Sequence, residues 1–200
     1  MYLSKVELTA PWTRDPYQWH RGLWQLFAGR PDAARSFLFR RETEVPGGRL
    51  MVLLQSPEAP VAGDDGVTVL ATKPFAPALK EGQWLRFHLT ANPVKTIKDS
   101  SGRLNRRGEP KSCRVPLIRT DQQEAWLRRK LEGAAKVRAV DIAARQPLYF
   151  RRQGDVGKIV PVRFEGILSV DDPQRLLELV RHGIGPAKAF GCGLLSLAPA

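Results

Sequence analysis

The sequence predicts an α+β protein built from two related β-α-β layers. Near both ends of the chain a strand-like run is followed by Asp-Pro, an amphipathic helical pattern, a glycine and a further strand. The first Asp-Pro is Asp15-Pro16 and the second is Asp172-Pro173. The repeat lies in the pattern of signals and not in residue identity. A chain of 200 residues can bury one large core or two small ones.

In the first half, apolar runs rich in β-forming residues alternate with Gly- and Pro-rich loops. They predict strands over residues 2–9, 50–55, 67–72 and 83–90. Asp15 as N-cap and Pro16 as first helical residue open a helix that we expect to end near Ala28, with Gly29 at C′. A second helical piece is expected over 33–41. This order is consistent with a ferredoxin-like unit that ends near residue 90.

The second half, residues 91–200, begins with a basic connector. Residues 103–114 mix Arg and Lys with Gly and Pro, so they cannot form a core and predict an exposed loop or ribbon. Thr120 and Gln123 match a capping box, which opens a predicted helix over 121–135. The remaining signals predict a β-hairpin over 148–162, a strand over 162–170, a helix from Asp172-Pro173 to Gly183 and a last strand over 194–198.

The charge balance favours a polyanionic partner. The 32 Lys and Arg residues outnumber 20 Asp and Glu, the net charge is +12, and the pI is near 10.3. Such an excess attracts nucleic acid by counterion release and steering. Cys113 and Cys192 are too few and too far apart for a zinc site or a disulfide scaffold. No signal peptide and no apolar run of about 18 residues occurs, so we expect a cytoplasmic protein without a membrane partner.

The first predicted helix carries two groups that can transfer protons and a fixed cation. With Tyr17 placed at zero on a helical wheel, His20 falls at roughly 300° and Arg21 at roughly 40°. All three therefore lie at the margin between solvent and an apolar stripe. That stripe comprises Trp19, Leu23, Leu26 and Phe27.

This trio meets the needs of RNA cleavage. RNA supplies its own nucleophile, the 2′-OH, so one group must accept its proton, another must protonate the leaving 5′-oxygen, and a cation must stabilise the phosphate. His20 and Tyr17 can share the acid and base roles while Arg21 assists electrostatically. We lean towards His20 as the acid, but the sequence leaves the assignment open. His88 in a strand and His182 at a helix end are expected to have no catalytic role.

A glycine-rich tail, residues 183–193, is the second signal. Gly185, Gly191 and Gly193 permit close backbone approach to a ligand, and Lys188 adds a charge in the middle. The tail can therefore hold RNA phosphate through backbone N–H groups, or it can simply connect a helix to the last strand. Dinucleotide and ATP fingerprints both fail, because Lys188 stands where a third glycine is required and no Gly-Lys-Ser/Thr occurs.

Several segments occur in an order that resembles one known family. They are residues 1–6, the Tyr17/His20 helix, and residues 30–35, 91–93, 113–117 and 183–199. Together they resemble the CasE family, the endoribonucleases that process CRISPR RNA in type I-E systems. The likeness covers nearly the whole chain, and the tail and first helix are its most specific parts.

The resemblance implies two tandem ferredoxin-like (RRM-like) domains with antiparallel sheets, which we place at 1–90 and 91–200. It implies cleavage without a metal or other cofactor at the base of each repeat stem-loop, leaving a 2′,3′-cyclic phosphate or 3′-phosphate. The family's catalytic pair maps onto Tyr17 and His20. The resemblance also implies that the CRISPR repeat RNA stem-loop stays bound and that other Cascade subunits are partners.

Basic clusters are the expected RNA contacts, because an A-form stem is recognised mainly by its shape and phosphates. Three are predicted: Arg151, Arg152 and Lys158 on the hairpin; Arg106, Arg107 and Lys111 in the connector; and Arg128, Arg129 and Lys130 on the helix after Thr120. One alternative is a non-catalytic module that only holds an RNA hairpin. A DNA-binding regulator is a third reading, disfavoured because no helix-turn-helix pattern stands out.

Overall fold

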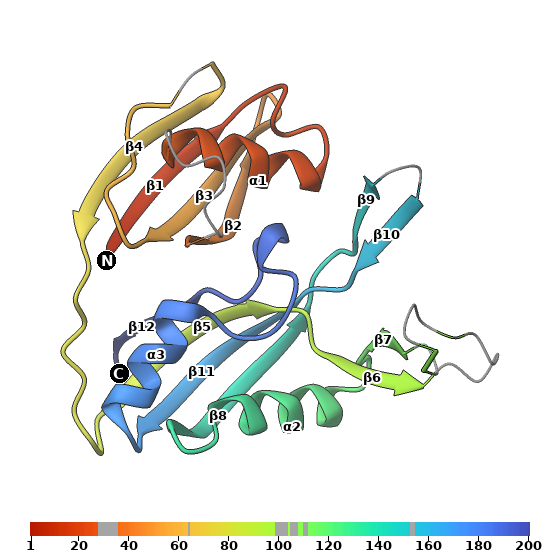
Figure 1. Cartoon of the computed structure of the whole chain (residues 1–200). Coiled ribbons are helices and arrows are strands. Elements are labelled where there is room, and N and C mark those ends of the chain that lie inside the picture. The colour runs from red at the N-terminus through yellow and green to blue at the C-terminus, as the bar shows by residue number, and fades with distance from the viewer. Residues whose placement is uncertain (28–35, 64, 99–103, 105–107, 110–111, 153–154) are drawn as a thin grey trace.

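The protein, seen here as a computed structural model, forms two halves that stack one above the other (Figure 1). The structure describes all residues except 28–35, 64, 99–103, 105–107, 110–111 and 153–154. The connection over 75–83 runs along one side of the molecule from the first half to the second.

The first half is a four-stranded antiparallel sheet with a helix on one face. Its strands are β1 (Tyr2–Leu8), β2 (Leu38–Val45), β3 (Arg49–Ser56) and β4 (Val67–Pro74), in the order β2-β3-β1-β4. Helix α1 (Pro16–Trp24) continues into the 3-10 turn η1 (Gln25–Phe27) and covers this sheet (Figure 1).

Local signals in the sequence explain where α1 begins and which side it buries. The Asp15 carboxylate accepts a hydrogen bond from the Tyr17 backbone N–H at 2.6 Å, and Pro16 occupies the first turn. The fully buried Leu23 packs with residues of β1, β2 and β3 in one apolar cluster. The predicted apolar stripe is therefore confirmed, whereas the predicted helix end at Ala28 and Gly29 lies outside the described residues.

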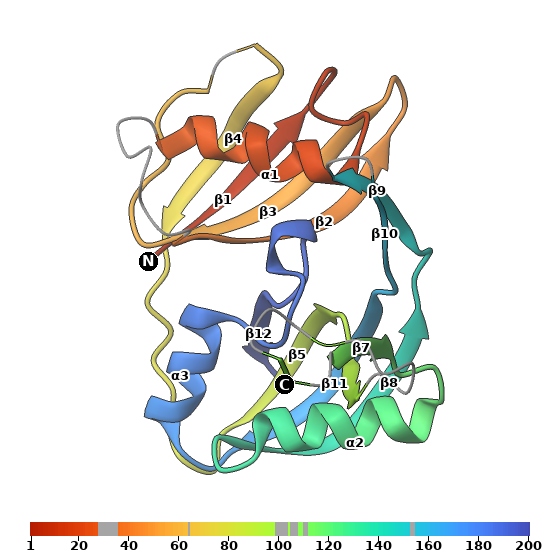
Figure 2. The same ribbon diagram turned by 45° about the vertical axis from the view of Figure 1, so that its right-hand side comes forward.

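The second half repeats this plan with insertions. Its sheet has the order β12-β5-β11-β8, and two helices cover one of its faces (Figure 2). The strands are β5 (Trp84–Ala91), β8 (Ala135–Ala144), β11 (Val162–Val170) and β12 (Leu195–Pro199), and the helices are α2 (Thr120–Leu131) and α3 (Pro173–His182). Leu127, Leu131, Leu176 and Val180 of these helices are buried against the sheet.

Two hairpins leave this second sheet. One pairs β6 (Val94–Lys98) with β7 (Ser112–Pro116), and the other pairs β9 (Leu148–Arg152) with β10 (Asp155–Ile159). Without them, both halves have antiparallel sheets of equivalent strand order, so the protein has two tandem ferredoxin-like units. The first is abbreviated, because the described residues between β3 and β4 contain no helix.

Three sequence predictions need correction. The helix expected over 33–41 is wrong where the structure describes it, because β2 begins at Leu38 and pairs with β3. Thr120 and Gln123 form no capping box; Gln123 instead donates to the Leu117 carbonyl at 2.8 Å. The helix expected to reach residue 135 ends at Leu131, and the strand β8 that follows was not predicted.

The expected division at residue 90 also conflicts with the strand pairing. Strand β5, assigned from sequence to the first half, pairs with β11 and β12 of the second sheet. We therefore propose that the domain boundary lies in 75–83, before β5.

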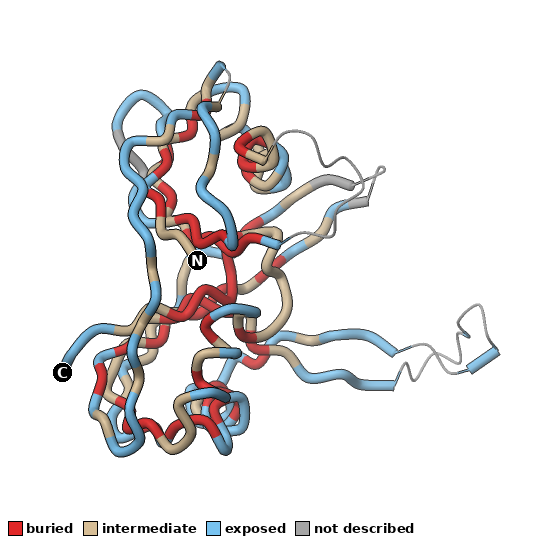
Figure 3. The backbone as a smooth tube through the Cα atoms, turned by 60° about the vertical axis from the view of Figure 1, so that its left-hand side comes forward, coloured by how far each residue is buried: buried red, intermediate tan, exposed pale blue. Residues whose placement is uncertain are grey.

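The backbone is largely buried where the two halves meet (Figure 3), and polar contacts join the halves there. Arg40 of β2 is 5% exposed, and its Nη1 donates to Ser196 Oγ at 2.8 Å and to the His88 carbonyl at 3.4 Å. Gln55 of β3 donates to the Val180 carbonyl of α3 at 2.7 Å. The halves are thereby held in one arrangement, which determines what lies beside α1.

Candidate active site

The predicted trio lies on the open side of α1. Tyr17 is 36% exposed, Arg21 is exposed, and His20 is half-buried at the edge of the apolar cluster. Because Tyr17 and His20 are three residues apart on a regular helix, their side chains are neighbours on one surface. Arg21 Nη1 donates to Gln18 Oε1 at 3.3 Å, so it stays on the same helix surface.

Aromatic rings surround the imidazole of His20. The indole Nε1 of Trp24 lies 3.1 Å from His20 Nε2 and donates a hydrogen bond to it. The ring of Phe37 lies 5.5 Å from that of His20, and Trp24 and Phe37 also meet edge to face at 5.3 Å. Phe37 is 1% exposed, so this side of the imidazole is fixed by the core.

Two elements of the second half lie directly beside this helix. Helix α1 contacts β9 and the 3-10 turn η2 (Lys188–Phe190) of the tail (Figures 1 and 2). At the base of the β9–β10 hairpin, Leu148 and Ile159 are buried in the same apolar cluster as Trp19 of α1. Phe150 of the hairpin and Phe190 of η2 pack with ring centroids 4.4 Å apart. The hairpin and the tail therefore converge on α1.

The glycines of the tail serve the fold directly. Gly185 has φ of +80°, and a Cβ there would lie 2.9 Å from the Trp126 ring. The N–H groups of Gly191 and Gly193 donate to the carbonyls of Lys188 and Thr90, at 3.3 and 2.7 Å. These two amides are thus occupied within the fold, which removes the support for phosphate binding through them.

Lys188 is the cation of this tail. Its Nζ donates to the His182 carbonyl at the end of α3, at 2.6 Å, and the residue is half-buried. Because η2 contacts α1, Lys188 lies on a turn beside the helix that carries the predicted trio. A role for Lys188 in RNA binding remains a prediction.

The three basic clusters differ in their positions. Lys158 is exposed on β10 and lies over the Tyr149 ring at 5.6 Å, whereas the structure describes only the backbone of Arg151 and Arg152, in β9. Arg128 and Arg129 lie on α2, at the opposite end of the molecule from α1 (Figure 2). The remaining residues, Arg106, Arg107 and Lys111, lie outside the described residues. Of these clusters, only the hairpin is brought to α1 within the described chain.

Arg128 is also engaged within its own half. It lies 2.7 Å from Glu124 Oε1 and donates to the Val137 carbonyl at 2.8 Å. These contacts fit a residue that joins α2 to β8, and an RNA contact for it stays a prediction.

The other two histidines and the two cysteines lie outside α1. His182 is exposed on α3 and lies 3.1 Å from Glu178, while His88 belongs to β5. Burial lowers the pKa of His88 to about 4, aided by Arg40, Arg163 and Arg145. Cys192 is buried, which raises the pKa of its thiol to about 12, and Cys113 is exposed.

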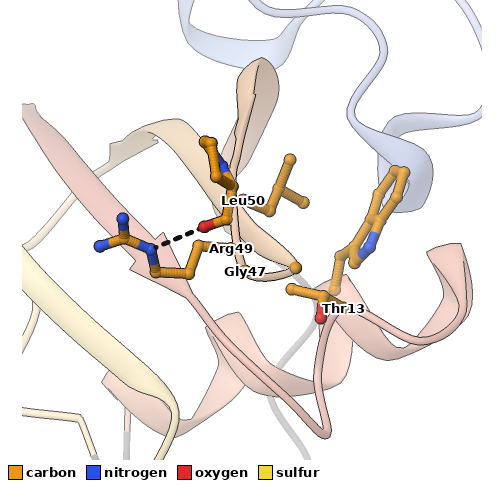
Figure 4. A pocket seen from close by; sticks show the side chains of 7 residues that line it. Thr13, Gly47, Arg49 and Leu50 are labelled. Carbon is orange, nitrogen blue, oxygen red and sulfur yellow. Dashed lines mark hydrogen bonds between the residues drawn. The ribbon is translucent and has the colours of Figure 1, made fainter.

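A pocket opens between the loop before α1 and the β2–β3 turn (Figure 4). Its lining includes Thr13, Trp19 and the turn 46–50, where Arg49 Nε donates to the Pro46 carbonyl at 3.3 Å. Tyr17, His20 and Arg21 are not part of this lining. The trio instead occupies an open surface, a form suited to a polymer.

Within the described residues, no three His, Cys, Asp or Glu side chains are grouped as a metal site. None of the helices described is both long enough and apolar enough to cross a bilayer.

Comparison with known proteins decides the family. A family model described as CRISPR associated protein matches residues 1–199. The Escherichia coli K12 protein named CRISPR system Cascade subunit CasE is 51% identical, with all of both chains covered. The chain belongs to the CasE family. A CRISPR-associated endoribonuclease named Cse3 from Thermus thermophilus is 37% identical, again over all of both chains.

Solved structures of CasE relatives have the same fold. The crystal structure of Cas6e from E. coli K-12 matches with a TM-score of 0.87 and 48% identity, covering both chains completely. Cse3 of T. thermophilus, bound to an RNA that represents a pre-cleavage complex, matches with a TM-score of 0.75 and 33% identity over both complete chains. These matches confirm the predicted pair of ferredoxin-like domains.

Sequence reasoning missed some residues that shape the site. Trp24 was assigned no role from the sequence, although its spacing of four from His20 is the signal for a side-chain contact. Phe37 fell within a region expected to be helical, and no local pattern pairs it with His20. The junction arginine, Arg40, was missed because nothing in its neighbourhood marks it as buried.

Proposed function

We propose that this CasE-family protein is an endoribonuclease that cleaves CRISPR precursor RNA at the base of the repeat stem-loop. The observation that carries the proposal is the pairing of Tyr17 and His20 on the open surface of α1, beside the basic hairpin and the tail of the second half. Family membership supplies the substrate, because the matching relatives are named as a Cascade subunit and a CRISPR endoribonuclease.

The residues support cleavage by internal attack. The ribose 2′-OH next to the scissile bond attacks the phosphorus as its proton passes to one group of the Tyr17/His20 pair. The 5′-oxygen leaves with a proton from the other, which yields a 2′,3′-cyclic phosphate that water can open to a 3′-phosphate. Arg21 stabilises the negative charge that develops on the phosphate oxygens. The reaction needs no metal ion.

The same surface accounts for retention of the product. The β9–β10 hairpin and η2 are anchored in the apolar cluster under α1, so a stem-loop held there keeps its contacts after the bond is cut. We further propose that the bound hairpin joins the protein to other Cascade subunits, as the name of the E. coli relative implies. We also propose a cytoplasmic location, because the transcript that it would cut is made there.

Replacing His20 by Ala tests the chemistry. Repeat RNA is incubated with the variant in single-turnover assays, and the fragments are resolved on gels. We expect cleavage to fall by at least about 100-fold, the lower range for loss of a general acid or base, with RNA affinity unchanged. His182→Ala is the matched control, because that imidazole is exposed on α3. Unchanged cleavage by the His20 variant would show that the proton-transfer groups lie elsewhere.

Two further conditions separate the proposal from its alternatives. Cleavage is expected to persist in EDTA, and a 2′-deoxy substitution at the cut site should leave binding intact while preventing cleavage. A non-catalytic hairpin-binding module would bind both RNAs and cut neither. Analysis of the fragment ends completes the test, with 5′-hydroxyl and 2′,3′-cyclic phosphate or 3′-phosphate ends expected.

A further inference from the structure

The hydrogen bond between Trp24 and His20 determines which nitrogen of the imidazole carries the proton. An indole N–H can only donate, so His20 Nε2, at 3.1 Å, must accept with its lone pair. A neutral imidazole that accepts at Nε2 carries its proton on Nδ1. An imidazolium has an N–H at both positions, and its Nε2 would point a hydrogen at the indole hydrogen.

The arrangement around this bond holds both rings in place. Trp24 and His20 meet edge to face with centroids 6.0 Å apart, and the buried Phe37 contacts both rings. Phe37 also stacks on Phe27 at 5.2 Å. In the free protein the indole therefore acts as a donor that supports one tautomer of one protonation state.

We infer that Trp24 is a positioning residue for the reaction, holding His20 as the neutral Nδ1–H tautomer with Nε2 covered until RNA displaces the indole. This inference rests on the proposed function of His20. It deepens that function, because His20 then meets RNA without a proton on Nε2 and is prepared to accept one there. The proton of the 2′-OH is the one to be accepted, which leaves the Tyr17 phenol as the donor to the leaving oxygen. This assignment reverses the direction favoured from sequence.

Most of the charged groups near α1 act in the same direction as the indole. On the helix itself they are Arg21 and, with the opposite effect, Asp15 at the N-cap. On other elements they are Lys188 of η2 and Arg41 of β2, whose guanidinium lies 5.3 Å from the Trp19 ring centroid. Strand β9, which also contacts α1, includes Arg151, Arg152 and the titratable Tyr149. Most are cations, which disfavour an imidazolium. A variant that changes only Trp24 leaves all of these charged groups in place, so it isolates the effect of the indole on His20.

Trp24→Phe is the variant that tests the inference, because it keeps an aromatic ring against Phe37 and removes the N–H donor; the smaller ring is matched by the same change in the control. The matched control is Trp12→Phe. The Trp12 indole donates to the Asp65 carbonyl at 2.9 Å and packs against Gly22 of the same helix, away from the trio. Nitrogen-15 NMR of the histidine side chains reports the tautomer, and single-turnover cleavage is followed as a function of pH.

In the free protein we expect His20 Nε2 to show the nitrogen-15 chemical shift of an unprotonated, hydrogen-bonded nitrogen. In Trp24→Phe, the pH at which His20 becomes protonated should rise by about 0.7 unit, corresponding to loss of one neutral hydrogen bond. The acidic limb of the pH–rate profile should rise by the same amount, with RNA affinity changed less than about twofold. Trp12→Phe should leave the spectrum and the profile as they are.

An unchanged His20 spectrum and pH–rate profile in Trp24→Phe would overturn the inference, as would equal shifts in the Trp12 control. The proposed function fails differently, by retained cleavage in the His20→Ala variant. The spectrum reports the tautomer whether or not the protein cuts RNA, so the two failures can be told apart.

Discussion

The three imidazoles of this chain have different surroundings, and those surroundings separate their roles. His182 is exposed beside Glu178, and His20 accepts from Trp24 at the edge of the apolar cluster. His88 stands among arginines on the second sheet. Glu165 lies 3.6 Å from His88 Nδ1, but burial and the arginine charges outweigh its attraction, so the pKa of His88 falls to about 4.

The lowered pKa predicts how stability depends on pH. Between the ordinary pKa of 6.5 and the folded value of about 4, the unfolded chain binds a proton at His88 that the folded chain does not. The contribution of His88 to stability is therefore complete above about pH 6.5 and is lost as the pH falls towards 4, by at most about 3 kcal/mol.

Urea unfolding of the protein and of His88→Gln at pH 7 and pH 4.5 measures this contribution. The variant should lose less stability between the two pH values than the parent chain, and His182→Gln should behave as the parent. An equal loss in the parent and in His88→Gln would assign the pH dependence to other groups.

At the scale of elements, the β9–β10 hairpin is the proposed link between the Tyr17/His20 pair and the RNA. Its base is fixed by Leu148 and Ile159 in the cluster below α1, and Lys158 is exposed farther along. A lysine that contacts RNA phosphate contributes through its charge and not through base recognition. Its removal should therefore weaken binding to the same extent for all stems of similar shape.

Lys158→Ala is expected to lower repeat-RNA affinity and to reduce the slope of log affinity against log salt by about 0.7–0.9. The measurement is a binding isotherm at several salt concentrations. Lys73→Ala is the control, since Lys73 is exposed on β4 at the other side of the molecule (Figure 1). A salt slope identical to that of the parent chain would remove Lys158 from the RNA contacts.

Elements with strong local signals were predicted well, and those without them were not. Asp15-Pro16 and Asp172-Pro173 cap α1 and α3 as expected, and strand β11 matches its prediction from Val162 to Val170. Strand β2 was mistaken for a helix because pairing with β3, a distant contact, determines its conformation. Thr120 matched the capping pattern, but the Gln123 side chain bonds to carbonyls of the preceding loop.

At the scale of the whole molecule, Arg40 is the main polar link between the halves. Burial lowers the pKa of its guanidinium, while Glu42, 2.8 Å away, opposes that shift. Its contacts with the His88 carbonyl and Ser196 join β2 to the second sheet. Local patterns predicted Tyr17 and His20 as a catalytic pair, and that assignment stays a prediction. They could not show that Arg40, or the hairpin and tail, connect the two halves.

Arg40→Met should lower the free energy of unfolding by about 2 kcal/mol, because it leaves Ser196 and the His88 carbonyl without a buried donor. Urea denaturation should show an earlier midpoint with an unchanged slope. Arg119→Met is the control, since Arg119 pairs with Asp121 on the open surface and its loss should not move the midpoint. An unaltered midpoint in Arg40→Met would show that other contacts hold the halves together.

The shared apolar cluster under α1 has a consequence for the order of synthesis. Tyr17 and His20 leave the ribosome early, but Leu148, Ile159 and Phe190, which complete their surroundings, are added late. Although domains fold from the N-terminus as they emerge, the cutting surface can be finished only when almost the entire chain has been translated. A nascent or prematurely terminated chain therefore carries the proposed catalytic pair without the surroundings that complete it.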